Sequence, residues 1–103
     1  MIVVEFPEPI GGELKFKVNG HAGKSEKGQD IVCAAVSTLT QTLAGGIQSG
    51  LGASVCGRLE SGDTELMIQV APENGEALKL ICNVFRFGFQ KICESYPEHV
   101  KMI

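Results

Sequence analysis

The sequence lacks a run of about 20 consecutive apolar residues, the length that a helix needs to cross a bilayer. Its N-terminal segment, MIVVEFPEP, has no basic region and is interrupted by Glu5 and Pro7, so it does not resemble a signal peptide. These absences argue against a membrane protein and against a secreted one. We therefore expect a cytoplasmic protein without a membrane partner.

A surplus of positive charge is also missing, because 9 basic residues face 12 acidic ones and the net charge is −3. Proteins that bind nucleic acids need clustered Lys and Arg to neutralise phosphates. We therefore expect no nucleic-acid partner. A basic peptide or protein would suit the charge better.

The cysteines show no CxxC or zinc-knuckle spacing, so we expect no structural metal and no other cofactor. If Cys82 and Cys93 share a helix, the rise of 1.5 Å per residue places their Cα atoms about 16 Å apart. A disulfide tolerates at most about 7 Å between Cα atoms. The sequence therefore predicts reduced thiols.

Apolar residues at alternate positions predict two strands near the N-terminus. Residues 1–6 are β-branched and apolar, and in ELKFKVNG the side chains of Leu14, Phe16 and Val18 share one face. Proline and glycine in residues 7–12 indicate a turn between the two segments. The pattern is typical of a hairpin.

A helix is predicted to follow a glycine-containing loop at residues 22–29. Asp30 is a favoured N-cap, which would make Cys33 the third helical residue. We expect the paired glycines Gly45 and Gly46 to end the helix. Its apolar positions recur at helical spacing: Val32, Ala35, Val36, Leu39 and Leu43.

The second half of the chain repeats this order of elements. Residues 50–70 read as a hairpin with its turn at 61–63, and a second amphipathic helix runs from Pro72 to about Tyr96. Residues 99–103 can add a short strand. The order ββαββα predicts an α+β fold, a two-layer sandwich with a largely antiparallel sheet and two helices on one face. The length predicts one domain, residues 1–103.

The segment GHAGKSEKGQDIVCAAVS, residues 20–37, carries the candidate chemistry. A thiol attacks only as the thiolate, and unpaired N–H groups at a helix N-terminus favour an anion. If the loop folds back, His21 can accept the proton of Cys33 and form a thiolate–imidazolium pair. The same N–H groups could stabilise an oxyanion. This arrangement has the parts of a cysteine hydrolase.

Each of these residues also has a purely structural interpretation. Cys33 could be a small buried hydrophobe, Asp30 a helix cap, and Ser37 a hydroxyl bonded back to its own helix. We expect the remaining cysteines to be structural. We expect His99 to be an ordinary surface residue.

The residues GHA at 20–22, Gly28 and DIVCAAVS at 30–37 resemble the signature of the ribosomal-processing cysteine protease family, Prp. The resemblance implies a homodimer that removes the N-terminal extension of large-subunit ribosomal protein number twenty-seven. The cut follows a phenylalanine in an apolar-then-basic motif. The resemblance assigns the nucleophile to Cys33 and the catalytic histidine to His21, with Asp30 and Ser37 as supporting residues.

The same resemblance implies that the loop between the catalytic pair, with Ala22, Gly23 and Gly28, closes over the substrate. We therefore predict a single cysteine protease domain. Two alternatives stay open: a non-catalytic protein that binds the ribosomal precursor, and a thiol redox sensor. The redox sensor is weakened because no resolving cysteine lies close to Cys33 in sequence.

Overall fold

The structure, a computed structural model, describes residues 1–21, 29–60 and 62–103. The elements occur in the order β1 (Ile2–Glu5), β2 (Glu13–Asn19), α1 (Gln29–Leu51), β3 (Ser54–Glu60), β4 (Asp63–Gln69), a 3-10 turn (Pro72–Asn74), α2 (Gly75–Ser95) and β5 (Val100–Met102). The predicted order ββαββα with a short final strand is confirmed.

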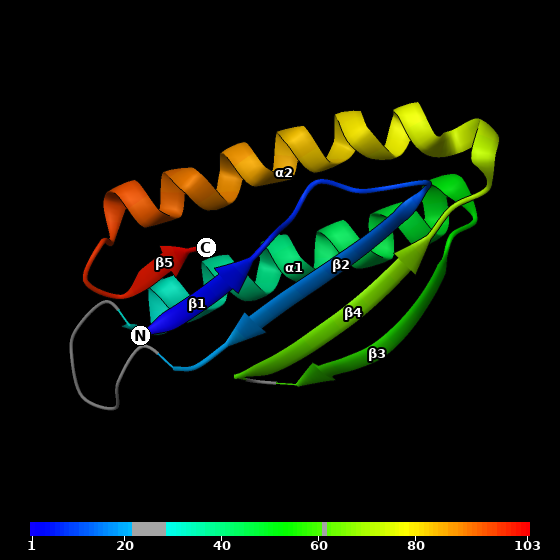
Figure 1. The fold of residues 1–103 in the computed structure, drawn as a ribbon. Helices are drawn as coiled ribbons and strands as arrows, with labels where there is room; N and C mark the ends of the chain where they lie inside the picture. The colour runs from blue at the N-terminus through cyan, green and yellow to red at the C-terminus, as the bar shows by residue number, and fades with distance from the viewer. Residues whose placement is uncertain (22–28, 61) are drawn as a thin grey trace.

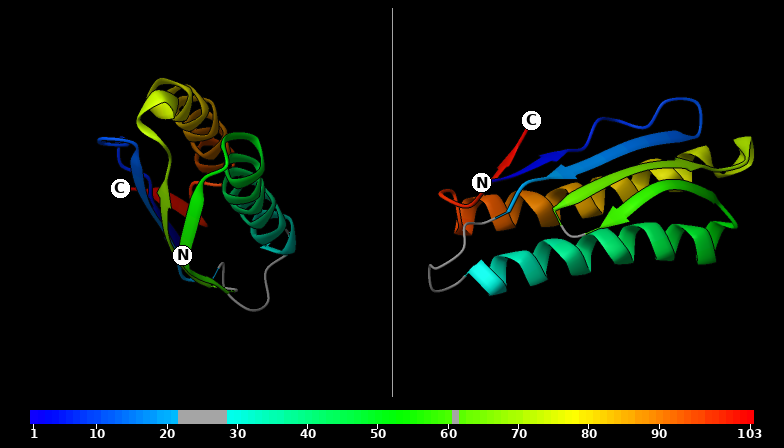
Figure 2. Two further views of the ribbon diagram at one scale, coloured as in Figure 1. Left: turned by 90° about the vertical axis from the view of Figure 1, so that its right-hand side faces the viewer. Right: turned by 90° about the horizontal axis from the view of Figure 1, so that it is seen from below.

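The strands form one sheet in the order β3-β4-β2-β1-β5. Neighbours are antiparallel except β1 and β5, which run parallel. Both helices lie on the same face of the sheet, and they run side by side along its length (Figures 1 and 2). The predicted two-layer α+β sandwich is therefore confirmed.

The core lies between the sheet and the two helices. In β2, Leu14, Phe16 and Val18 point to the helical face and are buried. The rings of Phe6, Phe16 and Phe89 meet there, with centroids 5.1 to 5.8 Å apart. Two of these contacts are edge-to-face, the arrangement that aromatic rings prefer. The alternating pattern of β2 thus sets which face of the sheet is covered.

Helix α1 is longer than the sequence predicts. It begins at Gln29, within the expected loop, and it continues through Gly45 and Gly46 to Leu51. Each interior glycine costs about 1 kcal/mol relative to alanine. Leu43, Ala44 and Ile47 are buried in the core on either side of the glycine pair, so packing outweighs that cost. The expectation that Gly45 and Gly46 end the helix was wrong.

The segment Ile31–Leu51 of α1 is also long and apolar enough to cross a membrane, with a mean hydropathy of 1.2. Core helices of soluble proteins reach the same length and hydropathy, and here one face of α1 packs on the sheet and on α2. Its buried residues recur at helical spacing: Val32, Val36, Thr40, Leu43, Ala44 and Ile47. About 33% of this segment is buried, so the place of α1 in the core accounts for the apolar residues on that face.

Candidate active site

A pocket of about 170 Å³ opens where the end of β2, the first half of α1 and the β3–β4 turn meet. Its lining residues are Ile2, Val18, Gly20, His21, Cys33, Val36, Ser37, Thr40, Gln41, Leu59, Glu60, Gly62 and Thr64. Three of the residues singled out from sequence, namely His21, Cys33 and Ser37, are among them. Elements that are distant in the chain therefore meet around the candidate catalytic residues.

Cys33 and Ser37 lie one turn apart on the face of α1 that borders this pocket. Cys33 is partly buried and packs against the hydrophobic core, whereas Ser37 is exposed. Farther along this face, the hydroxyl of Thr40 donates a hydrogen bond of 2.7 Å to the carbonyl of Val36. Thr40 is thus satisfied within its helix, while Cys33 and Ser37 face the pocket.

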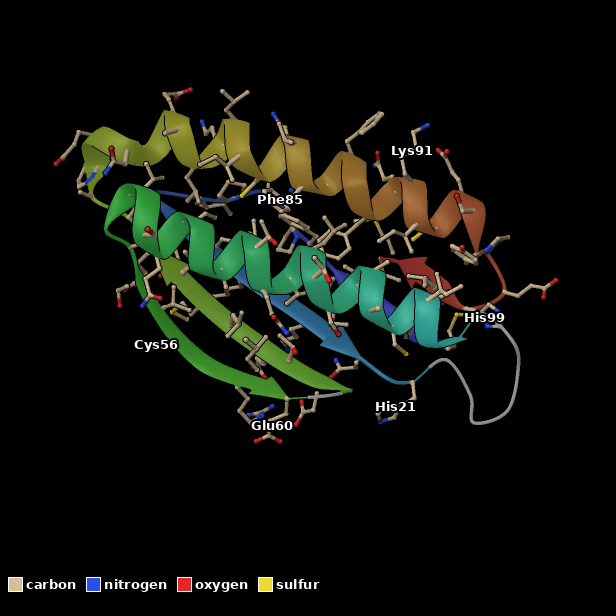
Figure 3. All side chains as sticks on the ribbon, turned by 180° about the vertical axis from the view of Figure 1, so that it is seen from behind. His21, Cys56, Glu60, Phe85, Lys91 and His99 are labelled. Atoms are coloured by element: carbon tan, nitrogen blue, oxygen red, sulfur yellow. The ribbon has the colours of Figure 1, made fainter. Side chains whose placement is uncertain are left out.

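His21 follows β2 directly and is held there by backbone contacts. The N–H of Gly20, at a φ of +99°, donates to the carbonyl of Gly62 at 3.1 Å. The amine of Met1 donates to the carbonyl of His21 at 2.7 Å. The imidazole lies against Gly62, where an added Cβ would overlap its Cε1 and Nε2 atoms. The ring is exposed at this end of the sheet (Figure 3).

The structure brings His21 and Cys33 to one pocket. Among the described residues, no hydrogen bond joins the imidazole to the Cys33 thiol. The candidate loop residues Ala22, Gly23 and Gly28 lie outside the described part of the chain. The two residues of the expected dyad therefore line one pocket without a hydrogen bond between them.

Asp30 lies in the first turn of α1 instead of preceding the helix, and its side chain is outside the described part. Because α1 begins at Gln29, Cys33 is the fifth residue of the helix and not the third, as was expected. The first four N–H groups of a helix lack intrahelical partners. The N–H of Cys33 falls beyond that set, so the unpaired donors at this terminus belong to residues that precede the cysteine.

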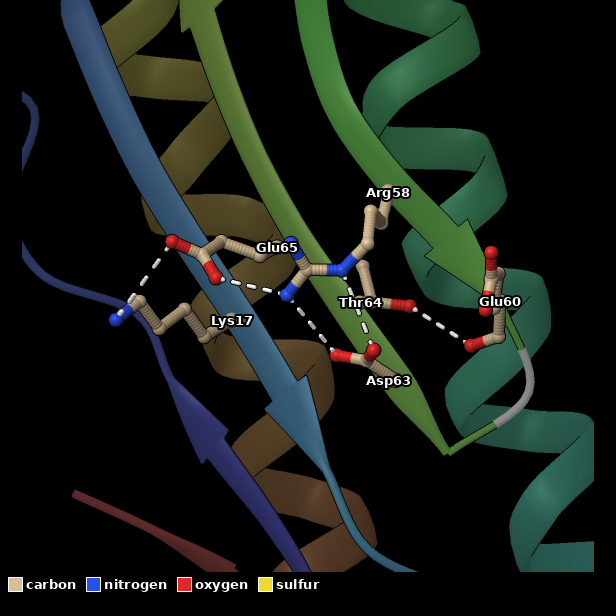
Figure 4. Close-up of polar contacts among 6 residues, drawn as sticks. All are labelled: Lys17, Arg58, Glu60, Asp63, Thr64 and Glu65. Atoms are coloured by element: carbon tan, nitrogen blue, oxygen red, sulfur yellow. Dashed lines mark hydrogen bonds and ion pairs between the residues drawn. The ribbon is translucent and has the colours of Figure 1, made fainter.

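Charged groups surround the β3–β4 turn on the outer face of the sheet (Figure 4). Arg58 donates to Asp63 at 3.2 Å and to Glu65 at 3.0 Å, and both interactions raise the pKa of the guanidinium, the hydrogen bond to Asp63 most strongly. Lys17 lies 3.9 Å from Glu65. Glu60, at the end of β3, is among the residues that line the pocket, so an acidic residue borders this end of the site.

The other cysteines do not line the pocket, and all four are free thiols. Cys82 is buried in the core, and burial raises the pKa of its thiol to about 11. Burial also raises the pKa of the partly buried Cys93 thiol. Cys56 is exposed on β3, with its sulfur 3.9 Å from the hydroxyl of Ser54. Within the described ranges, no group of three or more His, Cys, Asp or Glu residues could hold a metal.

His99 is half-buried just before β5 and is not simply a surface residue. Its carbonyl accepts a hydrogen bond of 2.8 Å from the N–H of Ile2. His99 therefore belongs to the junction between β5 and β1, and it does not line the pocket.

The sequence did not indicate that the β3–β4 hairpin contributes to the site. Leu59, Glu60 and Gly62 line the pocket from its tip. The local signal predicted a turn at residues 61–63 but said nothing of its neighbours in space. Pairing of β2 with β4 brings this tip beside His21, and that pairing joins residues far apart in the chain.

A family model described as cysteine protease Prp matches residues 1–101. No curated protein sequence matches the chain significantly. Among solved structures, SMU.848 from Streptococcus mutans is 30% identical, with a TM-score of 0.78 over 99% of this chain and 91% of the other.

Two further structures are of an essential ribosomal processing protease Prp from S. aureus. One is in complex with a substrate peptide, is 23% identical and has a TM-score of 0.77 over 100% of this chain and 98% of the other. The other holds a covalently linked product peptide, is 24% identical and has a TM-score of 0.75 over 99% and 97% of the two chains. At this identity, both share the fold with the present chain.

Proposed function

The chain belongs to the Prp family of cysteine proteases, and from that premise we propose that it removes the N-terminal extension of a large-subunit ribosomal protein, number twenty-seven in the standard naming. The observation that carries the proposal is the shared pocket of Cys33 and His21, which supplies a nucleophile and a base in a cysteine protease. The S. aureus structures with substrate and product peptides support a peptide as the ligand.

In the proposed reaction, Cys33 is the nucleophile and His21 the general base. His21 takes the thiol proton, and the sulfur attacks the scissile carbonyl carbon to form a tetrahedral intermediate. The C–N bond then breaks, and His21 gives the proton to the leaving amine. Water hydrolyses the remaining thioester with His21 again as base, which restores the thiol and releases the acid product.

This reaction requires substrate binding to bring the His21 imidazole to the Cys33 thiol, because no hydrogen bond joins these two described residues in the structure. Catalytic contacts often tighten only in the substrate complex. We assign Asp30 and Ser37 supporting roles, and we assign Ala22, Gly23 and Gly28 to a substrate loop. Ser37 is supported by its position in the pocket one turn from Cys33.

The pocket supports a cut after phenylalanine. A cavity of about 150 Å³ is large enough to hold benzene, and this pocket measures about 170 Å³. Ile2, Val18 and Val36 give it apolar walls. Glu60 supplies a carboxylate that suits basic residues beyond the cut. An apolar-then-basic substrate therefore matches both parts of the lining.

We also propose that residues 1–103 act as one protease domain, that the protein works in the cytoplasm, where ribosomes mature, and that it forms a homodimer. One core cluster, extending from Ile2 to Val100, supports the single domain. On the outer side of α2, Leu80, Val84 and Phe87 are 59% to 66% exposed at helical spacing. This apolar stripe offers a surface for a second copy.

The test is mass spectrometry of the ribosomal precursor, or of a peptide spanning its extension, incubated with the wild type and with Cys33→Ala. We expect a single cut after phenylalanine by the wild type and none by the variant, while the variant still binds the peptide. Ser37→Ala is the matched control on the same helix face, and we expect it to retain cleavage at a reduced rate.

The alternatives predict other results. A binding protein would bind the precursor without cutting it, and Cys33→Ala would bind the precursor as the wild type does. A redox sensor would show a rapid, peroxide-dependent change in activity in the absence of substrate. Neither cleavage nor binding would contradict the assignment of the ribosomal precursor as substrate.

A further inference from the structure

A second hollow, of about 280 Å³, lies between α1 and the edge strand β3. We call it the β3 groove. Its walls include Ala44 and Gly45 from α1 and Val55 from β3. Gln41 and Leu59 line both this groove and the pocket of Cys33. The two hollows therefore adjoin, and a chain held at Cys33 can extend into the groove.

Each wall of the β3 groove contains a glycine, where no side chain covers the backbone. Gly45 on α1 has no atom within 4 Å of where a Cβ would stand. On the opposite wall, Gly57 has a φ of +124°, and a Cβ there would overlap the carbonyl of Glu65. Glycine is therefore required at position 57, and the absence of a side chain leaves room for another main chain to approach.

Strand β3 ends the sheet, and within the described part of the chain it pairs only with β4. An edge strand presents a row of unpaired N–H and C=O groups to a further strand. Extended peptides bind such edges through main-chain hydrogen bonds, and side-chain pockets supply the specificity. The groove beside β3 therefore has both features that strand addition requires.

The chemistry of the groove selects apolar side chains. All of its described lining residues are uncharged, and they include the buried Leu66 and Leu59, which is 50% exposed and also lines the Cys33 pocket. A charged side chain would lose hydration here without gaining a partner. By contrast, the residues that line the Cys33 pocket include the acidic Glu60. Apolar and basic parts of a substrate are thus drawn to different places.

We propose that the β3 groove binds the apolar segment that precedes the cut, as an added strand on β3. This inference rests on the proposed function and extends it, because it assigns the groove as the subsite for residues remote from the scissile bond. Leu59, which lines both hollows, separates the residue held at the cut from the segment that precedes it.

The test uses a variant whose side chain fills the groove, and it compares the cleavage of a long and a short peptide. Gly45→Trp places a large side chain in the groove, and Gly46→Trp is the matched control because Gly46 is exposed, is free of Cβ contacts and does not line the groove. The long peptide carries the whole apolar segment. The short peptide keeps only the phenylalanine and its immediate neighbours.

For Gly45→Trp we expect kcat/KM to fall about tenfold or more with the long peptide, as is typical when an apolar subsite is lost. With the short peptide it should stay within about twofold of the wild type, as should Gly46→Trp with both peptides. Normal cleavage of the long peptide by Gly45→Trp would overturn the groove proposal and leave the proposed function intact. Failure of the wild type to cleave either peptide would contradict the proposed function itself.

A second measurement does not depend on the folding of Gly45→Trp. Cys56 is an exposed thiol on the edge strand β3, and the residue borders the β3 groove. Its alkylation by N-ethylmaleimide can be followed in Cys33→Ala, the variant that we expect to bind the peptide without cutting it. We expect the long peptide to slow alkylation of Cys56 several-fold and the short peptide to leave it unchanged. An unchanged rate with saturating long peptide would overturn the proposal.

Discussion

His21 is positioned less by its own contacts than by the residues beside it. Gly20, at positive φ, ties the end of β2 to Gly62. The imidazole packs on the face of Gly62, which has no side chain to displace it. Any Cβ at position 62 would occupy the space of the ring. The β3–β4 turn is therefore part of the support of the proposed base.

We predict that His21→Ala lowers kcat by about 10²- to 10⁴-fold, the range typical for loss of a general base. Because the side chain is exposed, the variant should keep its thermal stability. The measurement is steady-state cleavage of the long peptide, with KM determined separately. Unchanged kcat would remove His21 from the chemistry, whereas a change confined to KM would make it a binding residue.

At the scale of the element, α1 shows how packing overrides local propensity. The helix crosses the pair Gly45 and Gly46, where the sequence predicts its end, and stops only before Gly52 at a φ of +63°. Neither interior glycine has a neighbour within 4 Å of an added Cβ. Glycine is therefore not sterically required at these positions, unlike Gly52, whose conformation L side chains rarely adopt.

We predict that Gly46→Ala raises the free energy of unfolding by about 0.5 to 1 kcal/mol, because alanine restricts the unfolded chain and fits the open helix surface. Gly52→Ala is the control. It also meets no neighbour, but its positive φ should cost about 1 to 2 kcal/mol. Urea denaturation of both variants measures the difference. Stabilisation by Gly52→Ala would contradict the assignment of the helix end.

For the whole molecule, one core joins both helices to the sheet, and Arg86 links α2 to the segment after β1. Its guanidinium donates to the carbonyls of Phe6 and Pro7 at 3.3 and 3.1 Å, lies 4.6 Å from the centroid of the Phe6 ring and pairs with Glu8 at 3.1 Å. Cys82 is buried one turn before Arg86 on α2. Its thiol is therefore buried in the core that joins both helices to the sheet.

We predict that the buried Cys82 thiol lowers the free energy of unfolding in alkali. Burial raises its pKa from the ordinary 9.0 to about 11, so between these values the unfolded chain has lost a proton that the folded chain retains. The contribution is fully present below pH 9 and is lost as the pH rises through 11. Urea denaturation from pH 8 to 11 should show a shallower decline for Cys82→Ala than for the wild type.

The matched control is Cys56→Ala, which removes an exposed thiol. We expect its decline of stability with pH to follow that of the wild type. Identical declines for the wild type and Cys82→Ala would show that the buried thiol does not contribute.

Local patterns in the sequence determined the order of the elements, the buried face of β2 and the residues 20–37 that carry the family signature. Such patterns depend on neighbours within a few positions, and hydrophobic periodicity reports them directly. The tertiary structure decided the full length of α1, the pairing of β2 with β4 and the β3–β4 tip that completes the pocket with Leu59, Glu60 and Gly62. These features depend on contacts between distant segments, whose energies arise only when the core is assembled.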